Sequence, residues 1–337
     1  MSSGRTLRQL IKSGASGDTE AFRRVSEEVI REEREKQHHL LANDLEKILY
    51  GRPIAAAPTL RRLSEAVPTD RERGLPLLEI KEPVRNLDDV VLSDDNQALI
   101  ESILLEHRRA EVLQSYGLRA VDRLLFHGPP GCGKTLTAEV LAAELSHPLA
   151  IVRMDSLISS FLGETAANLR KVFDFAQTTP MVLLFDEFDA VAKERSDQSE
   201  HGELKRVVNA VLQMMDNCET RSVLIAATNH EAILDSAVWR RFEEVLMFTS
   251  PTPGQLQRLL EMKLRGVRRD FDPRATKITS RFKGLSHADV ERVLRHAIKE
   301  MILQSQDFLQ IQHLENALRR EQSRNKSTRS VHTRRSN

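Results

Sequence analysis

A glycine-rich octapeptide is the feature that most limits what this chain can fold into. The sequence GPPGCGKT fills residues 128–135, between the apolar run RLLF at 123–126 and the helix-forming run LTAEVLAAEL at 136–145. It matches the pattern G-x-x-x-x-G-K-[ST], which requires a strand before the loop and a helix after it. Glycines let backbone N–H groups turn inward around phosphate oxygens, and the helix N-terminus adds a partial positive charge. The sequence therefore predicts a nucleotide-binding site.

Two side chains at the end of the octapeptide have predicted contacts of their own. We expect Lys134 to reach the β- and γ-phosphates and the Thr135 hydroxyl to bind Mg²⁺. Cys132 stands at a variable position of the pattern, where a small filler residue is the simplest interpretation. The residues expected to bind the nucleotide are Gly128, Pro129, Pro130, Gly131, Cys132, Gly133, Lys134, Thr135 and Leu136.

Short apolar runs alternate with amphipathic helical patterns from about residue 80 to residue 250. They are continuous rather than alternating in polarity, as expected of strands buried on both faces of a parallel sheet. The predicted class is α/β, with the parallel five-stranded sheet of a P-loop NTPase sandwiched by helices. The five runs are RLLFHG, PLAIVRMD, MVLLFDEFD, SVLIAATN and EVLMFTS.

Composition divides the chain into four regions. Residues 1–80 form a charged, helical N-terminal region with a linker, which we expect to bind a client or partner. Residues 81–250 form the predicted α/β domain, and residues 251–317 a small all-helical lid domain. The last region, residues 318–337, holds seven Lys and Arg and one acid, and is predicted to be a basic disordered tail.

Bulk composition places few limits on function. The 40% hydrophobic and 29% charged content fits an ordinary globular protein. A formal net charge of +1 favours neither a nucleic-acid partner nor a membrane surface, and two cysteines argue against a disulfide framework. Without a long apolar run or a leader pattern, we expect a cytoplasmic protein that does not bind a membrane.

A second acidic motif predicts hydrolysis. The run MVLLFDEFD at 181–189 places Asp186 and Glu187 at the end of a buried strand. Asp186 is then placed to hold Mg²⁺, and Glu187 to activate the attacking water as a general base. Two surface acids would not explain the apolar run before them. The absence of N-K-x-D argues against a GTPase, and a water-directed Glu187 argues against a small-molecule kinase.

The next buried strand ends in Asn229, whose amide could orient the hydrolytic water against the γ-phosphate. Arg240 and Arg241 follow, and an arginine at the phosphoryl transition state contributes about 10³–10⁵ in rate. If the two lie far from their own phosphate loop, they could serve a neighbouring subunit. A surface basic pair is the alternative.

Taken together, residues 121–300 resemble the ATPase module of AAA proteins. The resemblance rests on GPPGCGKT, LLFDEFD, AATN and LDSAVWRRFEE in this order, and RSDQSEHGELKRVVNAVLQMMD with RRF is most similar to the katanin and spastin branch. It implies a ring, usually hexameric, with Mg-ATP held between subunits. It further implies that Asn229 senses the γ-phosphate and that Arg240 and Arg241 are trans-acting arginine fingers.

The run GLSHADVERVLRHA at 284–297 resembles the family's G-x-S-G-A-D segment near the adenine. The resemblance therefore places Ser286 and His287 at the nucleotide, although His287 stands where a glycine is usual. The segment NLDDVVLSDDNQ at 86–97 occupies the place of a second adenine-contacting segment, with a loose match.

The run SSFLGET at 159–165 puts an aromatic residue beside an aliphatic one on a predicted polar loop. It occupies the place of the family's first pore loop, so the resemblance implies that Phe161, Leu162 and Gly163 grip an extended polypeptide. The alternative is that Phe161 packs against its own subunit. The loop at 193–203 would be the second pore loop, with contributions from Glu194 and Arg195.

Three functions remain open on the sequence. The first is an ATP-driven machine that remodels or unfolds a polypeptide client by threading, for a separate protease or other partner, since no protease motif is present. The second is a nucleic-acid motor or loader that uses the basic tail. The third is a nucleotide-gated scaffold that threads nothing.

Overall fold

The computed structural model divides the chain into two compact units, Met1–Glu65 and Ala66–Asn337. In the first unit, α2 (Thr19–Glu35) is an amphipathic helix whose apolar positions include Phe22 and the buried Ile30. This helix agrees with the predicted helical N-terminal region. The structure describes residues 12, 19–35, 66–71, 73–157, 162–188, 210–216, 220–230 and 236–335, the last eleven of them as a backbone helix only.

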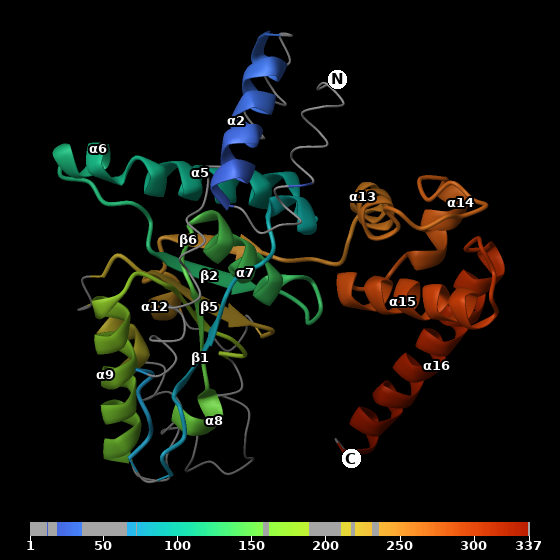
Figure 1. The fold of residues 1–337 in the computed structure, drawn as a ribbon. Coiled ribbons are helices and arrows are strands. Elements are labelled where there is room, and N and C mark those ends of the chain that lie inside the picture. The colour runs from blue at the N-terminus through green and yellow to red at the C-terminus, as the bar shows by residue number, and fades with distance from the viewer. Residues whose placement is uncertain are drawn as a thin grey trace. The chain divides into compact units, whose positions relative to one another are not determined.

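The second unit is built on a six-stranded sheet with the order β1-β3-β4-β5-β2-β6 (Figure 1). Five strands are parallel, and they are the five that the apolar runs predict. The strands are β1 (Leu78–Lys81), β2 (Arg123–His127), β3 (Leu149–Val152), β4 (Val182–Phe185), β5 (Val223–Thr228) and β6 (Glu244–Met247).

The sixth strand corrects the predicted start of the domain at residue 81. Strand β1 pairs antiparallel with β3, and Leu77 and Leu78 are buried in the core of this unit. Upstream of it, the buried Asp70 accepts a hydrogen bond of 3.1 Å from the buried Asn168 amide on α9 (Leu162–Thr178). The unit therefore begins at Ala66, and part of the predicted linker belongs to its sheet.

Alternate side chains of the four central strands, β3, β4, β5 and β2, enter two separate cores. Leu183 and Phe185 of β4 pack in the core that contains α9, whereas Val182 and Leu184 pack with Ile100 and other residues of the opposite face. Both faces of these central strands are thus covered, which explains why their sequences are continuously apolar rather than alternating. The remaining elements of this domain are η1 (Leu87–Asp89), α5 (Asp94–Arg108), α6 (Ala110–Ser115), α7 (Lys134–Glu144), α8 (Met154–Leu157) and α12 (Ser236–Trp239).

A helical lid follows the sheet, with its own apolar core around Leu260, Phe282 and Leu294. Two of its helices begin with capping boxes, at Thr252 and at Ser286, in which side chain and backbone satisfy each other's hydrogen bonds. Its elements are α13 (Pro253–Lys263), α14 (Thr276–Thr279), η3 (Ser280–Phe282), α15 (His287–Leu303) and α16 (Ile311–Arg335).

The predicted disordered tail at 318–337 is wrong for residues 318–335, because α16 is helical to Arg335 (Figure 1). The physical reason lies in its first turns. Leu318 is buried in the lid core, and the buried Glu321 carboxylate accepts a hydrogen bond of 2.5 Å from Arg292 on α15. Composition alone missed these two anchors. Among the helices that the structure describes, none is long and apolar enough to cross a membrane.

Candidate active site

The octapeptide forms the loop between β2 and α7, as its pattern predicts. Gly128 has φ 137°, and a Cβ there would lie 1.9 Å from the carbonyl oxygen of Phe248. Glycine is therefore required at this position by space as well as by backbone conformation. The loop is also tied to the sheet, because the Gly128 N–H donates to the Thr228 carbonyl at 3.3 Å.

Lys134 lies buried at the first turn of α7, with its ammonium group folded over the loop. Its Nζ donates to the carbonyls of Gly128 at 2.6 Å and Pro129 at 3.0 Å, and to Oδ1 of Asn229 at 2.8 Å. The cation is thus held at the loop centre, where it would meet phosphate oxygens. Asn229 follows β5, which lies between β4 and β2, so the sheet order brings it to the loop.

Thr135 and Asp186 meet at the same edge of the sheet. The Thr135 hydroxyl donates to Oδ2 of Asp186 at 2.6 Å. Mg²⁺ in nucleotide sites takes one or two protein oxygens together with phosphate and water, and these two oxygens fit that requirement. The residues that would hold the ion are therefore Thr135 and Asp186. Among the described residues, no group of three or more His, Cys, Asp or Glu forms a separate metal site.

Glu187 adopts a backbone conformation that is rare for a residue with a side chain. Its φ is +50°, and its N–H donates to Oδ1 of Asp186 at 2.9 Å. The next residue, Phe188, is buried, and its N–H donates to the Ala227 carbonyl at 2.8 Å. Such left-handed residues cluster at functional sites, held there by their surroundings. Glu187 lines the same cavity as Lys134 and Asn229, as a water-activating base would.

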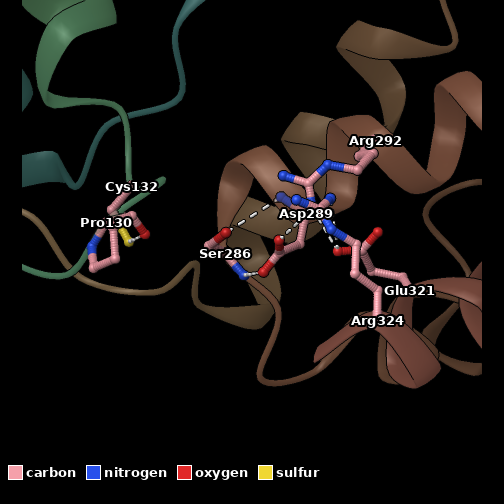
Figure 2. A network of polar contacts seen from close by, with 7 residues as sticks. All are labelled: Pro130, Cys132, Ser286, Asp289, Arg292, Glu321 and Arg324. Carbon is pink, nitrogen blue, oxygen red and sulfur yellow. Dashed lines mark hydrogen bonds and ion pairs between the residues drawn. The ribbon is translucent and has the colours of Figure 1, made fainter. Parts of the chain in front are cut away.

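The lid docks directly on the phosphate loop. The N–H of Ala288 donates to the Gly131 carbonyl at 3.0 Å, and a Cβ on Gly131 would lie 2.8 Å from the Ser286 hydroxyl. Figure 2 shows how this contact continues: Ser286 and Asp289 cap α15, Asp289 contacts Arg292, and Arg292 contacts Glu321 of α16. Polar contacts therefore run from the start of α15, which bonds the phosphate loop, to α16 of the lid.

Cys132 lies on the loop, opposite the start of α15 (Figure 2). It is buried, with its thiol 3.9 Å from the Pro130 carbonyl. Burial raises the pKa of the Cys132 thiol, so the neutral form is favoured at neutral pH. This agrees with its interpretation as a filler residue.

A cavity of about 350 Å³ joins the phosphate loop to the lid. At one end lie Lys134, Thr135, Asp186, Glu187 and Asn229. The other end is lined by apolar side chains from outside the octapeptide, including Val90, Val91, Leu259 and Met262. A flat aromatic base fits such an end, and the charged end fits a polyphosphate.

The predicted nucleotide contacts agree with this cavity in part. The predicted residues that line the cavity are Pro130 through Leu136 and His287. The other three do not line it: Gly128 and Pro129 accept hydrogen bonds from Lys134, and Ser286 caps α15. The sequence missed the contributions of Arg85, of α13 through Leu259, Met262 and Lys263, and of Glu291. No motif marks these residues, and those of α13 and α15 reach the cavity only through the docking of the lid.

The two arginines do not line the cavity of their own chain. Arg240 is exposed in the turn after α12, and Arg241 Nε lies 3.2 Å from Oδ2 of Asp216. This agrees with the condition under which the pair would serve a neighbouring subunit, and that role stays a prediction. Phe161, Glu194 and Arg195 lie outside the described residues. Leu162 and Gly163 begin α9, with side chains that are not described.

Comparisons with known proteins identify the family of the chain. The family model for the ATPase family associated with various cellular activities (AAA) matches residues 124–250. An AAA family ATPase of Sinorhizobium fredii is 43% identical over 324 residues, which are 96% of this chain and 97% of the relative. The chain belongs to the AAA family, and it binds and hydrolyses ATP.

Two archaeal relatives extend the comparison. A protein of Methanothermobacter marburgensis, named as a 26S proteasome regulatory subunit homolog, is 34% identical over 72% of this chain and 65% of its own length. A protein of Methanothermobacter thermautotrophicus that is also named as a 26S proteasome regulatory subunit homolog is 31% identical over 81% of this chain and 73% of its own length. The narrower likeness to katanin and spastin stays a prediction.

Proposed function

We propose that this ATPase assembles into a ring, a hexamer by family likeness, and uses Mg-ATP hydrolysis to remodel or unfold polypeptides that pass through a central pore. The observation that carries the proposal is that the described residues place few cations at the phosphate end of the cavity. Lys134 is the cation at the phosphate end of the cavity, and the other described cations lining it, Arg85 and Lys263, pair with Glu139 and Glu291.

A second subunit would complete such a site. Arg240 and Arg241 lie outside their own cavity, so a neighbour's pair could face the γ-phosphate and stabilise the charge of the transition state. A contact in which one copy's arginines serve the next copy's cavity is heterologous, and heterologous contacts form a ring when the rotation between copies closes. Assembly and hydrolysis would then depend on each other.

Exposed apolar residues support assembly. One set lies on α5, on α6 and in the segment just after α6, and includes Tyr116, which is 78% exposed. A second set lies at the end of α15 and beyond, and includes Leu303, which is 85% exposed. Large apolar residues gathered on a surface mark contact sites. The first set is Leu105, Val112, Tyr116 and Leu118, and the second is Ile302, Leu303 and Phe308.

Two observations support the proposal that the ring threads a polypeptide: the anchoring of α9 and the names of the archaeal relatives. The run SFLG leads into α9, and Leu169, Val172 and Phe173 anchor this helix in the core. A rigid helix is a firm base for a loop that pulls on a client. The names of the archaeal relatives refer to the proteasome, which favours a polypeptide client and permits a partner protease. We place the protein in the cytoplasm without membrane contact.

One observation keeps a nucleic-acid motor as the second candidate. Helix α16 runs to Arg335, and residues 319–335 carry seven Lys and Arg against the single acid Glu321, which is buried. A basic helix suits phosphate contacts whose strength falls with salt. The formal charge of the whole chain, +1, argues against an extended nucleic-acid surface. The nucleotide-gated scaffold remains the alternative in which the ring threads nothing.

The experiment measures ATP-dependent unfolding of a fluorescent protein that carries an unstructured tail. We expect the parent chain to unfold the fluorescent protein, so that its fluorescence is lost. In Phe161→Ala the rate of unfolding should fall far more than the rate of ATP hydrolysis. Val84→Ala, at a side chain that is 80% exposed, is the surface control and should match the parent. Equal unfolding by Phe161→Ala and the parent would contradict threading, and a salt-sensitive affinity for DNA would favour the motor.

A further inference from the structure

Two aromatic rings join the phosphate loop to the turn that carries the two arginines. His127 is the last residue of β2 and directly precedes Gly128 of the phosphate loop. Trp239 is the last residue of α12 and directly precedes Arg240 and Arg241, which form the arginine turn. The ring centroids lie 5.2 Å apart and the ring planes meet at 80°, an edge-to-face arrangement that aromatic rings favour. A displacement at the start of the phosphate loop therefore reaches the arginine turn directly.

The imidazole of His127 has a fixed place in the sheet. The residue is buried, and its backbone pairs with Thr228 of β5 on one side and with Met247 of β6 on the other. The Phe248 N–H also donates to the His127 carbonyl at 2.8 Å. Because a packed interior leaves little free space around a side chain, this ring follows any movement of the end of β2.

The arginine turn is anchored on both sides and open between them. Val238 and Phe242 are buried in the core that contains α9, whereas Arg240 is exposed. Trp239 packs against the same core but is only half-buried, and its carbonyl accepts a hydrogen bond of 3.3 Å from the Phe242 N–H. Since the two anchors stay in the core, a change in the packing of Trp239 is taken up by the adjoining Arg240.

Nucleotide binding acts on the loop residue that follows His127. An ammonium group has three hydrogens to donate, and Lys134 Nζ already has three acceptors. These are the carbonyls of Gly128 and Pro129 and Oδ1 of Asn229. A phosphate oxygen that bonds Lys134 must share or replace one of them. The shortest contact, 2.6 Å, is to the carbonyl of Gly128, so binding changes the forces on the end of β2.

We propose that the contact between His127 and Trp239 transmits nucleotide occupancy of a chain's own phosphate loop to its own arginine turn. Neither ring is among the described residues that line the nucleotide cavity, so His127 is a positioning residue that acts through Trp239. The consequence for hydrolysis rests on the proposed ring, in which the arginines serve a neighbouring subunit. Occupancy of one site then sets the activity of the next, and the ring hydrolyses ATP cooperatively.

The test uses Trp239 as its own reporter, since it is the single tryptophan of the chain. The fluorescence of the full chain is titrated with Mg-ADP, and calorimetry measures the affinity separately. The emission of the parent should change on binding. His127→Leu fills the buried space without a ring and should lose most of this change while it keeps the parental affinity. His127→Phe restores an aromatic ring and should recover the change.

Phe126→Leu is the matched control. It removes a buried ring from the preceding position of β2, where Phe126 packs against Phe248 in the core on the opposite face of the sheet. Its fluorescence response to Mg-ADP should match that of the parent. The second measurement is the rate of ATP hydrolysis against ATP concentration, in which His127→Leu should have a lower maximal rate and should lose cooperativity.

The outcomes separate the contact from the function on which it rests. A parental fluorescence response in His127→Leu would overturn the proposal, as would no response in a parent that calorimetry shows to bind Mg-ADP. A parent that does not bind Mg-ADP would overturn the ATP site as well. Failure of the proposed ring would differ again: the parent would hydrolyse ATP without cooperativity, while loss of the response in His127→Leu and its recovery in His127→Phe would still support the contact.

Discussion

The hydroxyl of Thr135 donates a hydrogen bond of 2.6 Å to Oδ2 of Asp186 and so joins the phosphate loop to the end of β4. These oxygens come from residues 51 positions apart, and the parallel pairing of β2, β5 and β4 brings them together. Thr135 and Asp186 are the residues that would hold a magnesium ion, which would supply positive charge to the phosphates.

Thr135→Val should therefore weaken Mg²⁺ binding, while the side chain keeps nearly the same size and shape. We expect Mg²⁺ activation of ATP hydrolysis to weaken about 10- to 100-fold, as for other disturbed metal sites. The measurement is ATPase rate against Mg²⁺ concentration. Thr178→Val is the control, because its exposed hydroxyl donates to the carbonyl of Phe175 within the same helix at 2.7 Å. A parental Mg²⁺ dependence in Thr135→Val would contradict the assignment.

Gly128→Ala should break the loop. Its φ of 137° and the 1.9 Å approach of a Cβ to the Phe248 carbonyl oxygen force the backbone to move. We expect a loss of about 2 kcal/mol or more in the free energy of unfolding, together with loss of nucleotide binding. Gly254→Ala is the matched control, since a Cβ there meets nothing within 4 Å. Chemical denaturation compares the two, and equal stabilities would show that the loop is not constrained as described.

Glu321→Ala should destabilise the lid. The Glu321 carboxylate is 3% exposed and bonds Arg292, so its removal leaves a half-buried guanidinium with one partner fewer. We expect about 2 to 3 kcal/mol of lost stability. Glu315→Ala, on the same helix, removes a partner of Arg281 that is 35% exposed rather than buried, and it should cost less stability than Glu321→Ala. Similar thermal unfolding of both variants would mean that α16 does not anchor in the lid at Glu321.

Mixing two inactive variants tests whether the arginines act between subunits. The double variant of Arg240→Ala and Arg241→Ala keeps its own Glu187, whereas Glu187→Gln keeps its arginines. In an equal random mixture of a ring, about a quarter of the sites combine an intact Glu187 with a neighbour's intact arginines. ATP hydrolysis should return in the mixture. Continued inactivity would indicate that the arginines serve their own subunit or none.

Much of the fold follows from local patterns. The five parallel strands were predictable because each contains a continuous apolar run, as burial of Val182 through Phe185 on both faces requires in the middle of the sheet. Strand β1 was not, because the exposed Glu79 and Lys81 alternate with Leu78 and Ile80, so LEIK lacks a continuous apolar run. Helix α16 was missed since its anchors, Leu318 and Glu321, lie within a run that is basic overall.

The candidate site likewise has a part that the sequence predicts and a part that it does not. Lys134, Thr135, Asp186 and Glu187 were predictable because short motifs fix them relative to a strand and a helix. The lid wall was not, because Leu259 and Met262 reach the cavity only when Ala288 docks on Gly131, more than 150 residues away in sequence. Asn168 and Asp70 likewise pair across 98 positions without any local signal.

The most direct test of the central claim traps the client. Glu187→Gln should bind ATP without hydrolysing it and so hold a client in the ring. We would recover this variant from its native cells with ATP, beside a variant that also carries Phe161→Ala. A particular protein retained by the single variant and lost from the double variant is the predicted result. Retention of the same proteins by both variants, or of nucleic acid alone, would contradict threading through a pore gripped by Phe161.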